Sequence, residues 1–412
     1  MIQFKLKNTY FFLVSLVLLL TISYSFKQNE SLDNSSSQEE NIIVGANKYE
    51  EYSKLLLNKK VAVVANQTSL VEFTVTGDKG IGTSNMHLVD FLLKINVDVQ
   101  KIFSPEHGFR GKADAGEFVE DGKDIKTGLP IFSLHGKHKK PSTEQLKGID
   151  VVVFDIQDVG VRFYTYISTM HYVMEACAEN EIPVIVLDRP NPNAHYVDGP
   201  VLEKEHQSFL GMHSVPVVYG MTIGEYALMI NGENWLKNGV KCKLTIVKLE
   251  NYNHTSKYRL PVRPSPNLPN DTSINLYPSL GFFEGTPINA GRGTEFQFQR
   301  YGSPDFPESD FSYTPKPNFG AKYPKHAQEK CFGVDLSQSD YQSSINLEWL
   351  LDAYNKTSDK KSFFGATFTA HAGTKKLQQQ IEKGKSAEKI KESWQKDLEA
   401  FKKIREKYLI YK

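Results

Sequence analysis

Carboxylate, amide and guanidinium side chains follow directly after short apolar runs at four places in the sequence. The clusters are Asn66-Gln-Thr68, Ser104-Pro-Glu-His-Gly-Phe-Arg-Gly111, Asp155-Ile-Gln-Asp-Val-Gly-Val-Arg162 and Asp188-Arg-Pro-Asn-Pro-Asn193. Carboxyl groups transfer protons, while amides and arginines hold polar ligands. The carboxyl ends of parallel strands meet at one edge of a sheet, where α/β proteins bind their ligands. We therefore predict one site built from these clusters, although turn formation and helix capping account for some of their members.

The apolar runs themselves indicate the fold that positions the clusters. Each run is short, continuous and mostly β-branched, which is typical of strands buried on both faces of a parallel sheet. The four runs are Val61–Val64, Val99–Phe103, Val151–Phe154 and Val184–Leu187. Amphipathic stretches at 86–94 and 168–180 and capping boxes beginning at Ser142 and Thr222 predict helices between and after them. The fold class predicted is α/β, with a Rossmann-like, mostly parallel sheet.

A proline-rich segment at 261–269 divides the chain, because four prolines exclude both a helix and a central strand. We predict a Rossmann-like domain at 45–264 and a smaller α+β C-terminal domain at 265–412. Residues 386–408 predict a long amphipathic helix, since apolar residues recur there at intervals of three and four.

The C-terminal domain contributes a glycine- and aromatic-rich segment at 281–300, which includes Glu284, Arg292, Glu295 and Arg300. Such a composition suits a rigid loop that closes over a ligand. The same residues are also compatible with a β-meander, in which glycines form turns and phenylalanines fill the core.

Composition excludes several classes of protein. The 412 residues include 49 basic and 48 acidic side chains, so no net field attracts nucleic acid. Three cysteines are too few for a disulfide scaffold or a multi-cysteine zinc site, and buried free thiols are expected. The first strand lacks the G-x-G-x-x-G continuation of dinucleotide-binding proteins, and P-loop, H-E-x-x-H and G-x-S-x-G motifs are absent from the sequence.

The N-terminus predicts export. Lys5 and Lys7 precede an apolar core at 10–20, and small residues follow at Ser23 and Ser25. This order is that of a secretory signal peptide, which we place at 1–25, followed by a polar linker at 26–44. A membrane anchor is the alternative, but the apolar core is shorter than the ~20 residues that a spanning helix requires. We expect a periplasmic or secreted protein.

Several ordered motifs together resemble one family. They are Asn66-Gln-Thr68, the Ser104–Gly111 motif, Phe154–Tyr166, Leu187–Pro192 and Gly291-Arg-Gly-Thr-Glu295. This combination resembles the NamZ-type exo-β-N-acetylmuramidases, a glycoside hydrolase family formerly described as a domain of unknown function. The likeness extends from about residue 45 to the C-terminus. One departure is Thr369-Ala-His-Ala-Gly373, where the family pattern has an acidic–basic pair before Ala-Gly, at a C-terminal substrate contact.

The resemblance implies that the Rossmann-like domain is catalytic and that the active-site cleft lies between it and the C-terminal domain. The implied activity is release of N-acetylmuramic acid from non-reducing ends of peptidoglycan fragments during cell-wall turnover or recycling. We expect no cofactor, no nucleic-acid partner and no stable membrane partner. The resemblance makes Glu106 the leading catalytic candidate, here the general acid. Glycoside hydrolysis needs a second carboxyl group, for which Glu295, Asp155 and Asp158 are candidates, and His107 could orient Glu106. The predicted substrate-binding residues are Asn66, Arg110, Asp158, Arg162, Tyr164, Tyr166, Asp188, Arg189, Asn191 and Arg292.

Muramic acid carries a lactyl carboxylate, and its recognition predicts an arginine, for which Arg110, Arg162, Arg189 and Arg292 are candidates. Two other functions remain open from the residues alone. One is a non-enzymatic muropeptide-binding protein that uses the same cleft. The other is a metal-dependent hydrolase that uses Glu106, His107 and Asp155.

Overall fold

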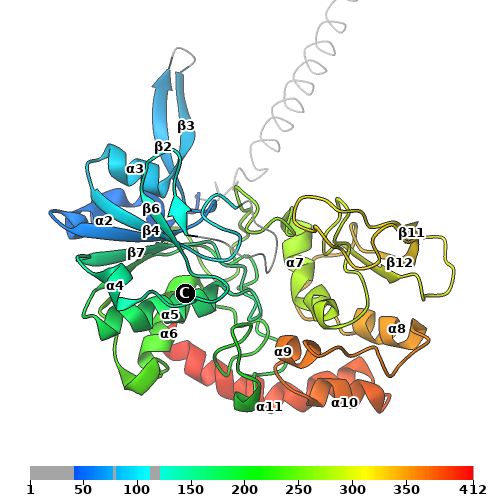
Figure 1. Ribbon diagram of the computed structural model, residues 1–412. Coiled ribbons are helices and arrows are strands. Elements are labelled where there is room, and N and C mark those ends of the chain that lie inside the picture. The colour runs from blue at the N-terminus through cyan, green and yellow to red at the C-terminus, as the bar shows by residue number, and fades with distance from the viewer. Residues whose placement is uncertain (1–40, 78–79, 112–120, 412) are drawn as a thin grey trace, which may run out of the picture. The chain divides into compact units, whose positions relative to one another are not determined.

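A seven-stranded sheet forms the centre of the N-terminal domain (Figure 1). The computed structural model describes residues 41–77, 80–111 and 121–411. The strand order is β5-β6-β4-β1-β7-β8-β9, and every neighbouring pair is parallel except β5 and β6. The strands are β1 (Lys60–Ala65), β4 (Asp98–Ser104), β5 (Gly122–Lys123), β6 (Pro130–Ser133), β7 (Val151–Asp155), β8 (Val184–Leu187) and β9 (Leu244–Val247). The predicted fold class and all four predicted strands are confirmed.

Alternate residues of the central strands enter two separate cores, one on each face of the sheet. Val61 and Val63 pack with helices α2 (Tyr49–Leu56) and α3 (Leu88–Lys94). Ala62 and Val64 pack with α5 (Tyr166–Glu179) and α6 (Ile223–Gly232). Burial on both faces explains why these strands are continuously apolar in the sequence.

Capping boxes begin two helices where the sequence predicts them. Ser142 and Gln145 cap α4 (Thr143–Leu146), and Thr222 and Glu225 cap α6. The prediction of a helix over 86–94 is wrong at its start, because Met86 and His87 end a strand of the antiparallel hairpin formed by β2 (Leu70–Gly77) and β3 (Gly80–His87). The helix begins only at Leu88, where His87 is the N-cap.

The C-terminal domain combines helices with a three-stranded antiparallel sheet of order β10-β12-β11. Its strands are β10 (Arg300–Ser303), β11 (Ser312–Tyr313) and β12 (Cys331–Asp335). Its helices are α7 (Asp271–Leu280), the 3₁₀ helix η4 (Gly281–Gly285), α8 (Glu348–Lys356), α9 (Phe368–Ala372), α10 (Lys376–Glu382) and α11 (Ala387–Arg405). The predicted long helix is confirmed as α11, which buries Ile390, Trp394, Leu398 and Phe401.

Segment 281–300 is not a β-meander. Its first residues form the 3₁₀ helix η4, and Phe282 and Phe283 are buried in the main core. Only its last residue, Arg300, belongs to a strand.

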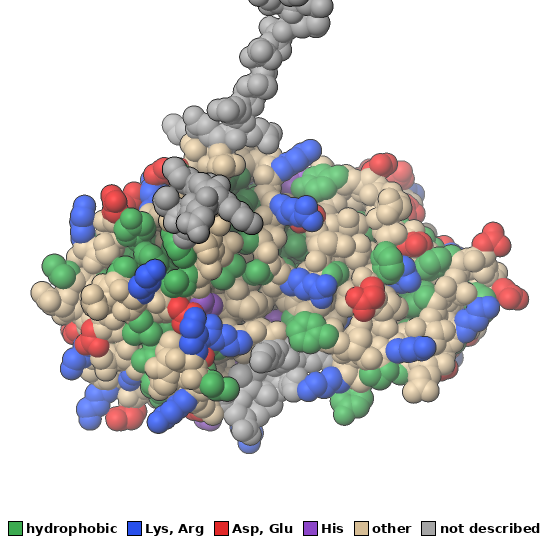
Figure 2. Space-filling view, turned by 90° about the horizontal axis from the view of Figure 1, so that it is seen from above, with side chains coloured by type: hydrophobic (Ala, Val, Ile, Leu, Met, Phe, Trp, Pro, Cys, Tyr) green, Lys and Arg blue, Asp and Glu red, His purple; other side chains and the backbone are tan. Residues whose placement is uncertain are grey.

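The predicted signal peptide at 1–25 and most of the linker lie outside the described residues. From Ile42 onwards the chain forms one compact unit, and Ile43 already pairs with Glu250. Within the described residues, no helix has both the length and the apolar character needed to cross a membrane. All three cysteines are buried free thiols, as expected. On the face seen in Figure 2, basic, acidic and hydrophobic side chains are interspersed.

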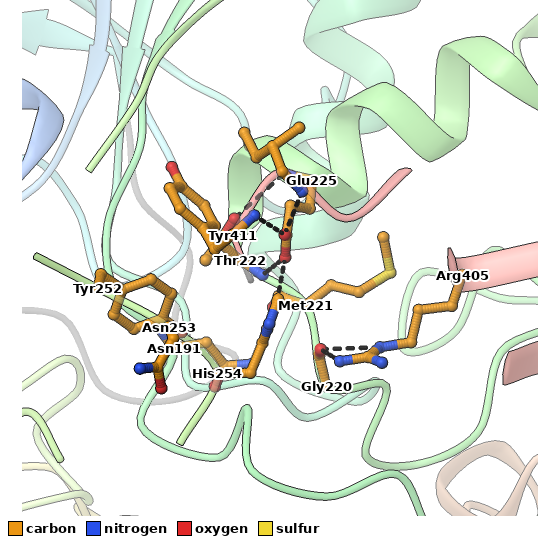
Figure 3. Close-up of polar contacts among 12 residues, drawn as sticks. Asn191, Gly220, Met221, Thr222, Glu225, Tyr252, Asn253, His254, Arg405 and Tyr411 are labelled. Carbon is orange, nitrogen blue, oxygen red and sulfur yellow. Dashed lines mark hydrogen bonds and ion pairs between the residues drawn. The ribbon is translucent and has the colours of Figure 1, made fainter. Parts of the chain in front are cut away.

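The C-terminal end of the chain returns to the N-terminal domain and is fixed there by buried carboxylates (Figure 3). One oxygen of Glu225 accepts hydrogen bonds from the backbone N–H groups of Ile410 (2.9 Å) and Tyr411 (3.4 Å). Its other oxygen lies 3.0 Å from the Thr222 backbone nitrogen and 2.8 Å from Nε2 of His254. The Tyr411 hydroxyl donates to Asp188 at 2.5 Å. Glu225 therefore ties residues 410–411 to the start of α6.

We expect Glu225→Gln to lower the free energy of unfolding by about 3 kcal/mol, because a buried carboxylate with four partners is replaced by an amide that places a donor against other donors. Urea denaturation measures this change. The exposed substitution Glu388→Gln on α11 is the matched control and should stay within about 0.5 kcal/mol of the wild type. Equal stability of the two variants would contradict the assigned role of Glu225.

Candidate active site

A cavity of about 130 Å³ opens between the two domains. The N-terminal domain lines it with Glu106, His107 and residues 163–166, and the proline-rich segment with Ser265, Asn267 and Leu268. The C-terminal domain lines it with Tyr277, Glu284, Arg292, Phe298 and His371. The predicted cleft is thus present, and two carboxyl groups from different domains face it.

Glu106 reaches the cavity because β4 ends at Ser104 and the chain turns immediately afterwards. His107, which also lines the cavity, has a left-handed backbone with φ of 71°, a conformation that costs energy in a non-glycine residue and is common at functional sites. The hydroxyl of Thr165 donates a 2.8 Å hydrogen bond to Oε2 of Glu106. Thr165 stands directly before α5, so the helix start holds the carboxyl group in place.

Tyr164 and Tyr166, both predicted to bind substrate, are among the residues that line the cavity. Their rings meet edge to face with centroids 4.7 Å apart. The Tyr164 hydroxyl donates to the Pro264 carbonyl at 2.7 Å, and Nδ2 of Asn66 donates to the Tyr166 hydroxyl at 2.9 Å. Asn66 is fully buried, so it supports the wall from behind rather than facing the cavity.

Glu284 is the carboxyl group that the C-terminal domain brings to the cavity. Arg292 donates to it at 3.0 Å, and both side chains remain about one quarter exposed. Burial alone would raise the pKa of Glu284, but the charges of Arg292 and Lys325 outweigh this effect and hold the pKa below its usual value. Glu284 is therefore ionised at neutral pH.

The position of Glu284 depends on a close approach of two helices. A Cβ atom at Gly285 would lie 2.3 Å from the Cα atom of Phe368, so only glycine lets η4 contact α9 there. The backbone N–H of Gly365 also donates to the Gly285 carbonyl at 2.8 Å. This contact brings Glu284 into the same cavity as His371 of α9.

Glu295, one of the three candidates for the second carboxyl group, is exposed and is not among the residues that line the cavity. It lies on the same segment as Glu284, but beyond the turn at 291–294. Of the two glutamates in segment 281–300, the structure places Glu284 at the cavity.

Three of the four candidate arginines are engaged elsewhere. Arg110 pairs with Asp124 at 2.9 Å and lies outside the cavity lining. Arg189 is buried and forms a bidentate pair with Asp155 at 2.6 and 2.8 Å. Arg162 is fully buried and binds backbone carbonyls only. Arg292 is the candidate that lines the cavity.

The remaining predicted residues build the edge of the sheet. Asp188 accepts from Thr222, Gly224 and Tyr411, and Asn191 donates to the Met221 carbonyl at 2.8 Å. Both side chains are buried and neither lines the cavity. For these two residues, capping and turn formation account for the polar side chain.

The structure does not support a metal site formed by Glu106, His107 and Asp155. Both carboxylate oxygens of Asp155 are occupied by Arg189, and the residue is fully buried. Within the described residues, the group with suitable ligand spacing is Glu203, Glu205 and His206, none of which lines the cavity.

Asp158 is buried and lies behind the cavity wall, where Tyr219 and the backbone N–H of Gly160 donate to one of its oxygens. Among the described residues, its other oxygen has no hydrogen-bond partner. Burial raises the pKa of Asp158 to about 6, although the Tyr219 hydrogen bond opposes this shift. Compared with the unfolded chain, the folded protein therefore binds a proton on Asp158 more tightly.

The raised pKa of Asp158 predicts a pH-dependent stability. An aspartate with a folded pKa of about 6 and an unfolded pKa of about 3.9 binds protons more tightly when folded, so its contribution is full below pH 4 and is lost as the pH rises to 6. The stability difference between wild type and Asp158→Asn should shift by about 2 kcal/mol against the wild type between pH 4 and pH 7. Urea denaturation at both pH values measures it, and a pH-independent difference would contradict the assignment.

Comparisons with known proteins agree with this architecture. Residues 61–272 match the family model of the N-terminal domain of exo-β-N-acetylmuramidase NamZ, and residues 275–411 match that of its C-terminal domain. The peptidoglycan β-N-acetylmuramidase NamZ of Bacillus subtilis (strain 168) is 37% identical over 429 residues, covering 98% of this chain and 100% of that protein.

Two crystal structures of DUF1343 family proteins from Bacteroides fragilis NCTC 9343 are similar to the chain. Their TM-scores are 0.81 and 0.75, with 44% and 29% sequence identity, and each comparison covers 90% of this chain and 99% of the other. Both domains, their order along the chain and the parallel sheet are thus those of one family. The chain belongs to the NamZ family of exo-β-N-acetylmuramidases.

Proposed function

We propose that this glycosidase releases N-acetylmuramic acid from the non-reducing ends of peptidoglycan-derived saccharides, with Glu106 as the general acid and Glu284 as the second carboxyl group. The observation that carries the assignment is that both groups, one from each domain, line the same cavity. The named activity of the Bacillus subtilis relative supports the substrate class.

The two carboxyl groups differ in their surroundings, as hydrolysis of a glycosidic bond requires. Glu284 is held ionised by Arg292 and Lys325, which suits a base that activates water or a nucleophile that attacks the anomeric carbon. The proton for the departing oxygen must then come from the other group. Glu106 supplies it, and the Thr165 hydroxyl keeps its carboxyl group oriented.

The walls of the cavity suit a sugar that carries a carboxylate. The half-buried Tyr277 ring provides apolar surface for a pyranose, and Arg292 provides a guanidinium group for the lactyl carboxylate that distinguishes muramic acid from glucosamine.

The proposed substrate belongs outside the cytoplasm, and the predicted signal peptide at 1–25 agrees with it. We propose that the enzyme acts in the periplasm or outside the cell after cleavage of this segment, in turnover or recycling of the cell wall.

Glu106→Gln and Glu284→Gln should each lower kcat/KM for a chromogenic β-N-acetylmuramide by about 100- to 10,000-fold, since each removes one group of an acid–base pair. Glu295→Gln is the matched control, because Glu295 is exposed and lies outside the cavity lining. Wild-type turnover by either cavity variant, or loss of activity in the control, would overturn the assignment.

Arg292→Lys should lower the ratio of kcat/KM for the muramide to that for the matching glucosaminide by about tenfold or more, because a bidentate contact to the lactyl carboxylate is lost. The ratio isolates recognition of the lactyl group, since any effect of Arg292 on Glu284 applies to both substrates. Arg110→Lys, outside the cavity lining, should leave the ratio unchanged. An unchanged ratio in Arg292→Lys would exclude this residue as the lactyl contact.

A further inference from the structure

His371 lies in the cavity with Glu106 and Glu284. It belongs to the segment 369–373 in which this chain departs from the family pattern, so the family motif assigns no role to the histidine itself. It belongs to the short helix α9, and its side chain is 9% exposed. Its Nδ1 atom lies 3.0 Å from the Thr367 carbonyl oxygen, one helical turn earlier. A carbonyl oxygen only accepts hydrogen bonds, so Nδ1 carries the proton and Nε2 presents a lone pair.

The ring is neutral at neutral pH. Burial lowers the pKa of His371, and the nearby charges of Lys325 and Arg162 lower it further, against opposing effects of the Thr367 hydrogen bond and Glu284. The neutral ring with its proton on Nδ1 makes Nε2 a hydrogen-bond acceptor rather than a cation.

Within the described part of the chain, no group hydrogen-bonds to Nε2 of His371. The atom is also not one of the buried polar atoms that lack a partner. Nε2 therefore keeps access to solvent, and because the ring lines the cavity, that access leads into the site where the sugar is proposed to bind.

The backbone that carries the ring is fixed by Arg162. One terminal nitrogen of this guanidinium donates to the carbonyls of His371 at 2.9 Å and Ala372 at 2.8 Å. Gly373 follows with φ of 76°, and a Cβ atom there would lie 2.5 Å from the same nitrogen. The ring of Phe163 packs 5.4 Å from the imidazole, centroid to centroid. The acceptor is thus held in place before any ligand arrives.

We propose that Nε2 of His371 accepts a hydrogen bond from a hydroxyl group of the muramyl ring and determines part of the enzyme's affinity for that sugar. The inference rests on the proposed function, since it names a contact in the same site. A hydroxyl is the group that fits, because the lone pair of Nε2 repels the lactyl carboxylate, whereas a hydroxyl needs an acceptor of this kind. His371 thus contacts the sugar and takes no part in the transfer of the catalytic proton.

The test pairs His371→Phe with substrates that lack single hydroxyl groups. Phenylalanine keeps an aromatic ring but has no acceptor. For a β-N-acetylmuramide we expect KM to rise about tenfold with kcat little changed, because the loss falls on binding. The 4-deoxy and 6-deoxy muramides form a double-mutant cycle with this variant. One of the two deletions should weaken binding to the wild type by about tenfold and have no further effect in His371→Phe.

His195→Phe is the matched control. His195 also has a ring nitrogen bonded to a backbone carbonyl, that of Gln342 at 3.0 Å, and burial also lowers its pKa, but it does not line the cavity. It should retain wild-type kinetics, and His371→Gln, which offers an amide oxygen in place of Nε2, should recover part of the lost affinity. Circular dichroism verifies that all three variants fold.

Calorimetric titration with free N-acetylmuramic acid separates this inference from the proposed function. If the wild type binds the sugar but does not hydrolyse the muramide, the proposed function fails, whereas binding about tenfold weaker in His371→Phe still supports the contact. Unchanged affinity and KM in His371→Phe would overturn the inference. It would also be overturned if the effect of the substitution and the effect of the missing hydroxyl were independent for both deoxy substrates.

Discussion

The buried guanidinium of Arg162 is the interaction on which the geometry of the site depends. It donates to the carbonyls of Pro200 and Val215 in the N-terminal domain and to those of His371 and Ala372 in the C-terminal domain. The residues that follow it, 163–166, line the cavity from the N-terminal domain, and His371 lines it from the C-terminal domain. A single side chain therefore links the two domains beside the cavity.

This arrangement has an electrostatic cost. No carboxylate pairs with Arg162 among the residues the structure describes, and burial lowers its pKa to about 9. Four carbonyl oxygens replace the water that a guanidinium loses on burial, and two of them stand at the C-terminal end of α9, where the helix dipole favours a positive charge. The same positive charge acts on His371 and helps keep its ring neutral.

Much of the fold follows from local patterns. Continuous apolar runs such as Val151–Phe154 are diagnostic of strands covered on both faces, and the capping boxes at Ser142 and Thr222 depend only on residues three positions apart. Two of the predicted polar clusters also contribute to one cavity, since Glu106, His107, Tyr164 and Tyr166 all line it.

The roles of individual residues depend on contacts that local patterns do not contain. Asp155 and Arg189 lie 34 positions apart in the sequence and form an ion pair. Arg110 forms an ion pair with Asp124. Glu284 and Glu295 stand in the same glycine-rich segment, and only the packing of Gly285 on Phe368 brings the first into the cavity. The Asn270–Ser273 capping box is a sequence signal for helix α7, which precedes this segment, whereas the burial of Phe282 and Phe283 is known only from the structure.

We propose that one cavity between the domains holds the muramyl ring between Glu106 and Glu284. A crystal structure of the enzyme soaked with N-acetylmuramic acid would test this placement. We expect the anomeric carbon to lie between the two carboxyl groups and the lactyl carboxylate to contact Arg292. A sugar bound elsewhere, or one whose anomeric carbon lies beyond reach of both carboxyl groups, would contradict it.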